Sequence, residues 1–274
     1  MNMSFTTIHT STIETPASKN QDMVLTGKLP NGNIWYIVAD GHGNNTVIDK
    51  LRSLNYLEIM LNGKPVDIIY EEINKITNTF NSGATISLVM ISSTTISMYW
   101  RGDSTIKVWA DNVQVFESEN HDDSNAGEVE RMNNMGIRKI ESWAPKVLSG
   151  DTLTMVRKNY FVVGRDNNTG ALDKLNMTNC VGHNNCALGN TDEHHIEMIV
   201  GVDYKVVAAS DGLWDIVAPD DSINEYSSST SLSDFAIMRW GQEWNYAFPG
   251  HPTVKNRLDS RDDIGVAMWV GGIF

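Results

Sequence analysis

Short apolar segments that end in Gly, Asp or Asn recur along the chain, and they are rich in β-branched and aromatic residues. This composition is typical of β-strands. Several of the segments are apolar almost throughout, which predicts strands that are buried on both faces. We expect strands over residues 34–39, 85–91, 95–100, 105–110, 160–163, 205–209 and 264–270.

Other segments repeat apolar residues every three or four positions, which is the period of a helix that packs one face against a core. Three such patterns occur, at Val47, Leu51, Leu54 and Leu61, at Ile69, Ile73, Ile76 and Phe80, and at Ile237, Trp240, Trp244 and Phe248. A shorter helix is expected over residues 128–134. Because the expected strands and helices do not alternate strictly, the pattern favours an α+β fold, with helices on mostly antiparallel sheets, over a doubly wound parallel sheet.

The overall composition is typical of a globular protein. Of the 274 residues, 41% are hydrophobic and 20% are charged, which excludes a disordered, collagen-like or coiled-coil chain. The 34 acidic and 21 basic side chains leave a net charge of −13, which disfavours nucleic-acid partners and suits either divalent cations or simple solubility. No repeat or Pro/Gly linker divides the chain, so we expect a single domain over residues 1–274, with residues 1–18 a loosely ordered N-terminal segment.

The sequence carries few signs of export or membrane insertion. It has no run of about 18 or more apolar residues, and its N-terminus lacks the basic and apolar regions of a signal peptide. The two cysteines, Cys180 and Cys186, form neither a disulfide framework nor a Cys-x-x-Cys motif. We therefore expect a cytoplasmic monomer that contacts neither membrane nor nucleic acid.

Acidic residues gather at the ends of apolar segments. Asp40 and Asp211 directly follow two expected strands, Asp262 lies just before a third, and Asp22 belongs to an acidic motif near the N-terminus. If these carboxylates converge, they repel one another unless cations lie between them. A ligand set made only of oxygen favours hard ions such as Mg²⁺ or Mn²⁺. A single Asp-Gly pair is usually only a turn, so the prediction depends on the order and spacing of all four motifs.

Two residues that follow Asp40 add to this prediction. The backbone carbonyl of Gly41 can itself serve as a metal ligand. His42 lies two residues after the carboxylate, where an imidazole can donate a proton beside a metal-activated water.

The motifs, in this order, resemble those of the metal-dependent protein phosphatases, the serine/threonine phosphatases of type 2C. The strongest matches are Asp40-Gly41-His42-Gly43, Ser210-Asp211-Gly212-Leu213-Trp214-Asp215 and Arg261-Asp262-Asp263-Ile264. Supporting matches are Asn20-Gln21-Asp22, Ser82-Gly83-Ala84-Thr85, Gly102-Asp103-Ser104 and a degenerate segment, Leu175-Asn176-Met177-Thr178, that closes at Val181-Gly182. Together they extend over most of the chain.

The resemblance implies a four-layer αββα sandwich, in which two antiparallel sheets are flanked by antiparallel helix pairs. It also implies two Mg²⁺ or Mn²⁺ ions in a cleft at one edge of the sandwich. Asp40 would bridge both ions, and Gly41 would give its carbonyl to one of them. Asp211 and Asp262 would bind the other ion, and Asp22 would support the site through water or a hydrogen bond.

The activity implied by the resemblance is hydrolysis of phosphoserine or phosphothreonine in a phosphoprotein. A metal-bridging water would attack phosphorus in line, and His42 would protonate the leaving oxygen. Asp40 and His42 are therefore the expected catalytic residues.

The chain departs from the pattern of the family at several positions. Gln21 replaces a Glu, and Ala17 stands where many members have a phosphate-binding Arg. Asn179 and His183 replace an Arg and an Asp of the motif beside the flap. These changes leave the expected two-metal core intact and leave open an unusual substrate or low activity.

A further departure concerns a third metal ion. Asn120 stands where the family has an Asp that helps to hold this weaker ion. A neutral amide oxygen binds a hard cation less tightly than a carboxylate does, so we expect the third position to be weak or absent. Asp122 or Asp123 could take the place of the missing carboxylate.

Two other functions remain open from the sequence. The first is a pseudophosphatase, in which the same fold acts as a binding or regulatory module. The second is a protein that binds divalent cations for structural reasons, and His42 beside Asp40 argues against it.

Overall fold

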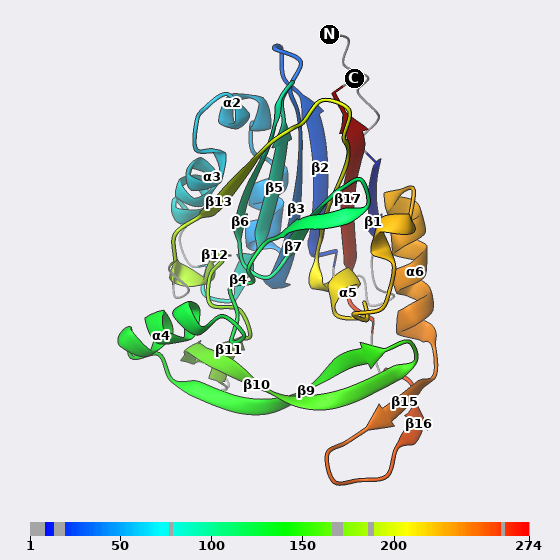
Figure 1. Ribbon diagram of the computed structural model, residues 1–274. Coiled ribbons are helices and arrows are strands. Elements are labelled where there is room, and N and C mark those ends of the chain that lie inside the picture. Colours follow the sequence, from blue (N-terminus) through cyan, green and yellow to red (C-terminus); the bar gives the residue numbers. More distant parts are fainter. Residues whose placement is uncertain are drawn as a thin grey trace.

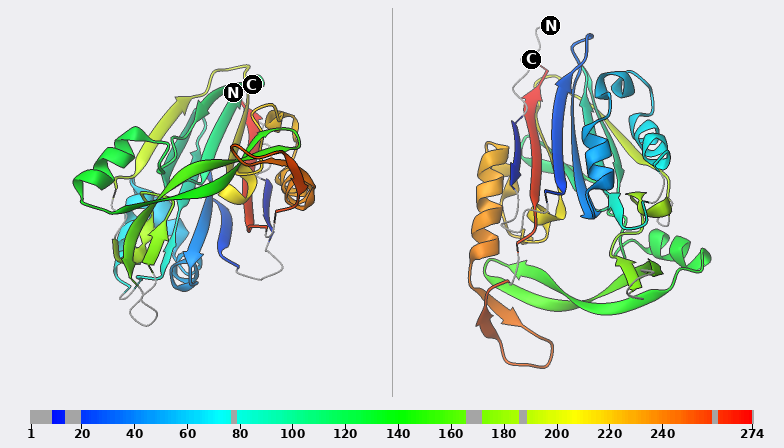
Figure 2. Two further views of the ribbon diagram at one scale, coloured as in Figure 1. Left: turned by 90° about the horizontal axis from the view of Figure 1, so that it is seen from below. Right: turned by 180° about the vertical axis from the view of Figure 1, so that it is seen from behind.

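The computed structural model describes residues 9–13, 20–76, 79–165, 172–185, 189–258 and 261–273. Two β-sheets packed face to face form its centre, as Figures 1 and 2 show. The first has seven strands: β2 (Asp22–Lys28), β3 (Ile34–Gly43), β4 (Ser82–Ala84), β5 (Ile86–Ile91), β6 (Thr95–Arg101), β12 (Val181–Gly182) and β13 (Asp192–Glu197). The second has five: β1 (His9–Ile13), β7 (Thr105–Ala110), β8 (Val113–Glu117), β14 (Asp203–Ala209) and β17 (Ile264–Gly272). The strand pairs of both sheets are antiparallel.

The layer between the two sheets is apolar. Val38 and Val89 from the first sheet pack in one cluster with Val206 and Ala267 from the second, and all four are fully buried. Tyr36 crosses between the sheets, where its hydroxyl donates a hydrogen bond to the carbonyl oxygen of Val206 at 3.2 Å. The near-continuous apolar strands expected from the sequence are therefore the strands that fill this layer.

Helices cover both outer faces of the sandwich. On the first sheet lie α1 (Thr46–Arg52), α2 (Tyr56–Met60) and α3 (Pro65–Asn74), and on the second lie α5 (Asp211–Trp214) and α6 (Ser229–Gly241) (Figure 1). Two 3₁₀ turns, His183–Asn185 and Ile223–Glu225, complete the helical segments. The expected four-layer αββα sandwich is confirmed. Its second helical layer consists of one long helix and a single turn rather than two long helices.

A third sheet lies across the lower end of the sandwich in Figure 1. It contains β9 (Lys139–Ser149), β10 (Thr152–Arg165), β11 (Leu172–Leu175), β15 (Trp244–Ala247) and β16 (Val254–Asn256), and α4 (Ala126–Asn134) leads into it. We call the hairpin of β9 and β10 the β9–β10 arm. The view from below in Figure 2 shows that the arm crosses both sheets of the sandwich.

All seven expected strands are confirmed, and several are longer than expected. The segment over residues 160–163 is the last part of the 14-residue strand β10. The short helix over residues 128–134 is confirmed as α4. The expected N-terminal segment of residues 1–18 contains β1, and the rest of it lies outside the described residues.

The helical pattern that ends at Trp244 and Phe248 was wrong. Helix α6 ends at Gly241, and Trp244 begins β15. The reason is that α6 buries a different face, which carries Leu232 and Ala236, against the second sheet. Trp244 is still buried, but as part of a strand that pairs with β10 and β16. The other two patterns form helices that are shorter than the apolar periodicity suggested, because α1 ends before Leu54 and α3 ends before Phe80.

Candidate active site

Asp22 and Asp40 lie side by side at the lower end of the first sheet. The register of β2 and β3 pairs them directly, and directly paired residues of antiparallel strands project to the same face. Asp22 is buried, with 5% of its surface exposed. The motifs of these two residues, separate in the sequence, are therefore brought together by one strand pair.

Gly41 directly follows Asp40 in β3, in a place where only glycine fits. A Cβ atom here would lie 2.3 Å from Cγ1 of Ile48 and 2.8 Å from the carbonyl oxygen of Gln21. The amide of Gly41 donates to that same carbonyl at 3.0 Å. The close approach keeps the backbone of this turn against α1 and beside Asp40.

The second sheet contributes Asp211 and the pair Asp262 and Asp263. Asp211 begins α5 directly after β14 and Ser210, and Asp262 and Asp263 come just before β17. Gly212 lets these two segments touch, because a Cβ atom at this position would lie 1.8 Å from the carbonyl oxygen of Asp263.

Hydrogen bonds join the motifs of the two sheets. The hydroxyl of Ser210 donates to Oδ2 of Asp22 at 2.7 Å and accepts from the amide of Gly265 at 2.9 Å. The amide of Gln21 donates to Oδ2 of Asp263 at 3.0 Å. Three separate motifs thus form one continuous network across the lower end of the sandwich.

The buried carboxyl groups strongly perturb one another. Burial, followed by repulsion from Asp211, Asp263 and Asp262, raises the pKa of Asp22 to about 8. Burial is also the main cause that raises the pKa of Asp40 well above its usual range, followed by the charges of Asp211 and Asp22. The side chain of Asp211 therefore lies near that of Asp40, and the two carboxyl groups disfavour each other's charged form.

This donor set fits divalent cations in its chemistry. It consists of carboxyl oxygens, which hard ions prefer, and the carboxyl groups are held too close to ionise together without positive charge between them. As the side chains stand, no three His, Cys, Asp or Glu residues in the described part of the chain surround a point where an ion could sit. An ion that bound here would displace protons from these carboxyl groups, as metal ions generally do.

His42 is half-buried and is paired with another histidine. Its Nδ1 lies 3.1 Å from Nε2 of His183, and Nδ1 of His183 lies 2.9 Å from the carbonyl oxygen of Phe80. Within the described structure, Nε2 of His42 has no hydrogen-bond partner. Burial, followed by the charge of His183, lowers the pKa of His42 to about 3.

A second group of carboxyl groups adjoins the first. Asp103 is repelled by Asp211 and Asp122, and burial with this repulsion raises the pKa of Asp103 to about 7. The charge of Lys158, on the β9–β10 arm, acts in the opposite direction. Oδ1 of Asp103 has no hydrogen-bond partner among the described residues.

The three residues considered for a third ion have other hydrogen-bond partners. Oδ1 of Asn120 accepts from the hydroxyl of Thr105 at 2.8 Å. Oδ1 of Asp122 accepts from the amide and the hydroxyl of Ser124. Oδ2 of Asp123 accepts from the backbone amide of Asn159 at 2.6 Å and from its side-chain amide at 3.1 Å.

Comparisons with known proteins agree with this architecture. The chain matches a solved C. elegans sex-determining protein with a TM-score of 0.65 at 15% identity, over 98% of this chain and 66% of that one. It matches a serine-threonine phosphatase 2C from Toxoplasma gondii with a TM-score of 0.62 at 13% identity, over 99% and 96%. It also matches the serine/threonine phosphatase Stp1 from Staphylococcus aureus with a TM-score of 0.53 at 13% identity, over 100% and 96%. The chain has the type 2C phosphatase fold. No protein-family model matches the sequence, and no curated protein sequence matches it significantly.

The type 2C fold brings together the residues expected from the sequence. Asp22, Asp40, Asp211 and Asp262 interact electrostatically at one end of the sandwich, and Gly41 follows Asp40 in the same strand. Ala17 lies outside the described residues, as does Cys186, whereas Cys180 is buried.

The changed motif beside the flap has a structural role that the sequence did not indicate. Asn179 is fully buried, and its Nδ2 donates to the carbonyl oxygen of Asn190 at 2.7 Å. His183, in the same motif, is the partner of His42.

Sequence reasoning missed the pairing of His42 with His183. His183 was noted only as a departure from the family pattern, and no local motif links the two histidines.

Proposed function

We propose that this protein is a metal-dependent phosphatase that hydrolyses phosphoserine or phosphothreonine in phosphoproteins. The observation that carries the proposal is the convergence of Asp22, Asp40, Asp211 and Asp262 in one group of interacting carboxyl groups near His42. The phosphatases among the structures with the same fold support it.

The proposed cofactor is a pair of Mg²⁺ or Mn²⁺ ions. Asp40 would contact both ions, the carbonyl of Gly41 would bind one, and Asp211 and Asp262 would bind the other. Asp22 would hold the site together through its hydrogen bond with Ser210. The ions would neutralise the carboxylates and acidify a water molecule that attacks phosphorus.

His42 is the proposed proton donor to the leaving seryl or threonyl oxygen. A carbonyl oxygen only accepts, so His183 carries its proton on Nδ1, toward Phe80. Neutral His183 then accepts at Nε2 from Nδ1–H of His42, and this leaves a lone pair on Nε2 of His42. His42 must therefore take up a proton at Nε2 before it can give one to the leaving oxygen.

The substrate, the compartment and the assembly state are also part of the proposal. We propose a phosphoprotein substrate, a cytoplasmic location and a monomer that forms one domain over residues 1–274. Within the described residues, none of the helices has the length and apolar character needed to cross a membrane.

A metal-dependence assay tests this function directly. Protein stripped of metal should not hydrolyse a phosphoserine peptide, should gain activity when Mn²⁺ is added, and should lose it again when the ion is chelated. Turnover that is unaffected by chelation would contradict the proposal.

The second candidate is a pseudophosphatase that binds phosphoproteins without turnover. It is favoured by the altered residues Asn120 and His183, whose side chains are engaged by Thr105 and His42. Saturable binding of a phosphopeptide, with no phosphate release at any Mn²⁺ concentration, would support it over the enzyme.

A further inference from the structure

The third sheet is positively charged in a protein that is acidic as a whole. Residues 138–175 and 244–258, which form this sheet and its connections, contain nine basic and four acidic residues, a net charge of +5. Because the whole chain carries −13, the rest of it carries −18. Surfaces usually mix charges of both signs, whereas a field of one sign attracts a partner of the opposite sign. The third sheet is therefore the part of the molecule suited to an anionic partner.

Most of the basic side chains of the sheet are exposed. Among the described residues, the exposed ones are Arg138, Lys139, Lys146, Arg157, Lys174, Lys255 and Arg257. Two of them form ion pairs, Arg157 with Glu141 at 2.6 Å and Lys255 with Glu243 at 3.3 Å. In the described part of the chain, the other five form no ion pair. Their charge is thus not neutralised by neighbouring side chains.

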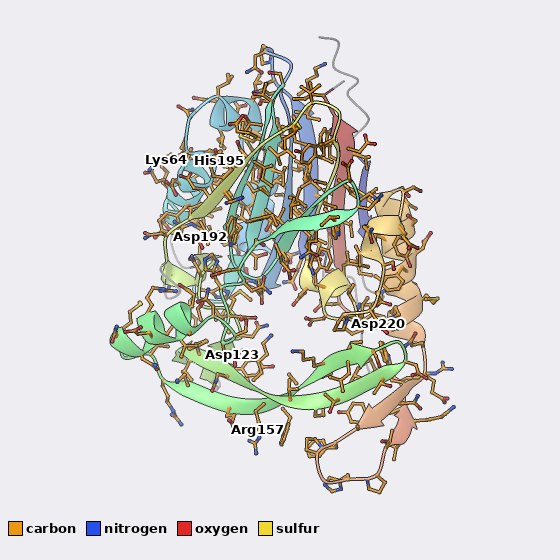
Figure 3. The ribbon with its side chains drawn as sticks, in the orientation of Figure 1. Lys64, Asp123, Arg157, Asp192, His195 and Asp220 are labelled. Atoms are coloured by element: carbon orange, nitrogen blue, oxygen red, sulfur yellow. The ribbon has the colours of Figure 1, made fainter. Side chains whose placement is uncertain are left out.

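A row of stacked side chains joins the β9–β10 arm to the β15–β16 hairpin. The guanidinium group of Arg157 lies 4.2 Å from the ring centre of Trp143. The ring of Trp143 packs against that of Phe248 with 4.7 Å between their centres, and Phe248 packs against His251 at 5.4 Å. We call these four residues the Arg157 stack. Arg157 itself projects away from the sandwich in Figure 3.

The Arg157 stack has the composition of an interface anchor. Arginine and aromatic residues are enriched at the centres of protein interfaces, and side chains that are already stacked lose less freedom when a partner binds. Nη1 of Arg157 donates to Glu141. A guanidinium group has five N–H donors, and Glu141 is the only hydrogen-bond partner of Arg157 in the described structure. The exposed guanidinium group can therefore bind a further carboxylate.

The geometry favours an acidic polypeptide over the two other common polyanions. Single-stranded nucleic acids stack their bases on free aromatic rings, but Trp143 is already packed against Arg157 and Phe248. The charge of −18 on the rest of the chain would also repel a long polyanion. A membrane-binding loop inserts free apolar side chains, whereas Phe248 is half-buried between Trp143 and His251. A short acidic segment needs only carboxylates that reach the basic side chains of the sheet.

We propose that the third sheet, with the Arg157 stack as its anchor, is a docking surface for an acidic polypeptide segment of a partner protein. The inference does not rest on the proposed function, because it uses neither the carboxyl groups of the candidate site nor a metal ion. The sheet lies across the end of the sandwich at which those carboxyl groups converge (Figure 2). A docked protein would therefore be held beside the candidate site.

The proposal is tested by the binding of a fluorescein-labelled oligoglutamate peptide, followed by fluorescence anisotropy. We expect saturable binding by the wild type that weakens as NaCl is added, because salt screens exposed charges. Arg157→Glu should weaken the affinity by roughly tenfold or more, since it replaces attraction by repulsion. The double variant Lys146→Glu/Arg257→Glu should have a similar effect, and it breaks no ion pair in the described structure. Absence of binding by the wild type, or unchanged affinity in the double variant, would overturn the proposal.

Lys28→Glu/Lys64→Glu is the matched control. It changes the net charge as much as Lys146→Glu/Arg257→Glu does, but both of its lysines are exposed on the sandwich. Lys64 lies at the other end of the molecule from Arg157 in Figure 3. We expect this control to bind the peptide as the wild type does. An equal loss of affinity in the control would show that only the net charge matters, and it would overturn the proposal.

Hydrogen exchange on the wild-type protein locates the bound peptide without any substitution. We expect the peptide to slow exchange in β9, β10 and β15. Slower exchange confined to other segments would overturn the proposal, as would peptide binding that requires added Mn²⁺, which would place the peptide on the candidate metal site.

Two other anions test the choice of partner. A single-stranded oligodeoxynucleotide and vesicles that contain phosphatidylserine would compete with the labelled peptide. We expect both to compete weakly, and tighter binding of either one than of oligoglutamate would overturn the proposal. None of these readouts needs turnover. If the protein hydrolyses no phosphopeptide but binds oligoglutamate as expected, the proposed phosphatase function fails and the docking surface stands. If the protein is an active phosphatase and does not bind the peptide, the docking surface fails alone.

Discussion

Nδ1 of His42 and Nε2 of His183 lie 3.1 Å apart, so the two rings share one hydrogen bond. The carbonyl oxygen of Phe80 fixes the tautomer of His183, and His183 in turn fixes that of His42. Hydrogen bonds to the far nitrogen of an imidazole set both its orientation and its proton position. His183 is therefore a positioning residue for His42.

Replacement of His183 should test this relationship. In His183→Leu, Nδ1 of His42 loses its acceptor, and we expect hydrolysis of a phosphoserine peptide to fall roughly tenfold or more. His183→Gln should restore most of the activity, because its amide oxygen can accept from His42 while its NH₂ group donates to Phe80. Steady-state kinetics of phosphopeptide hydrolysis by the wild type and the two variants would measure these effects. Equal activity of His183→Leu and His183→Gln would contradict a positioning role.

His42 itself should matter most when the leaving group is poor. A serine alkoxide needs a proton as it leaves, whereas p-nitrophenolate does not. We expect His42→Gln to slow phosphopeptide hydrolysis by roughly 100-fold or more, with a much smaller effect on p-nitrophenyl phosphate. Equal losses on the two substrates would indicate that His42 only shapes the site.

Asp40→Asn should abolish metal-dependent turnover. Asp40 is the carboxyl group proposed to contact both ions, and it lies beside Asp22 and is repelled by Asp211. We expect the affinity for Mn²⁺ to fall by more than about 100-fold and the activity to fall with it. The affinity should be measured by titration alongside the activity, and full turnover in Asp40→Asn would rule out the two-metal mechanism.

Asn120→Asp should strengthen a third metal position only modestly. The substitution keeps an acceptor for Thr105 and adds a negative charge, which a hard cation prefers. Mn²⁺ titration of Asn120→Asp beside the wild type would measure the gain. Three fully occupied ions in the wild type would contradict the expectation.

Gly212→Ala should destabilise the fold and the site together. A Cβ atom at this position would lie 1.8 Å from the carbonyl oxygen of Asp263, and backbone cannot move aside as a flexible side chain can. We expect a loss of about 3 kcal/mol in the free energy of unfolding, which is typical of severe overpacking. Gly63→Ala is the control, since nothing lies within 4 Å of the corresponding Cβ position. Equal unfolding midpoints of the two variants in urea would contradict the prediction.

The sequence indicated the candidate site better than it indicated the elements around it. The motifs of Asp40, Asp211 and Asp262 each adjoin a buried apolar strand, and strand ends are readily located from such patterns. The antiparallel order of the sheets then brings these ends to one place. The residues that could not be predicted depend on contacts between segments far apart in the chain, as the pairing of His42 with His183 does.

The local sequence pattern fails to predict the secondary structure of two segments, for the same physical reason. Trp244 continues the apolar period of the preceding helix, but the chain gains a strand pair with β10 when α6 ends at Gly241. The polar run Asp192–Glu197 gave no sign of β13, because this strand lies at the edge of its sheet and buries little of its surface. Tertiary context overrides local pattern in both segments.

The four carboxyl groups of the candidate site come from different sheets, with Asp22 and Asp40 on the first and Asp211 and Asp262 beside strands of the second. An ion bound by all four carboxyl groups would link the two sheets of the sandwich. The affinity for the ion would then depend on how well the two sheets pack against each other, because the free energies of metal binding and folding are linked. A substitution far from the site can therefore affect it. Tyr36→Phe, which removes the hydrogen bond from Tyr36 to the carbonyl oxygen of Val206, should weaken metal binding before it causes any loss of secondary structure.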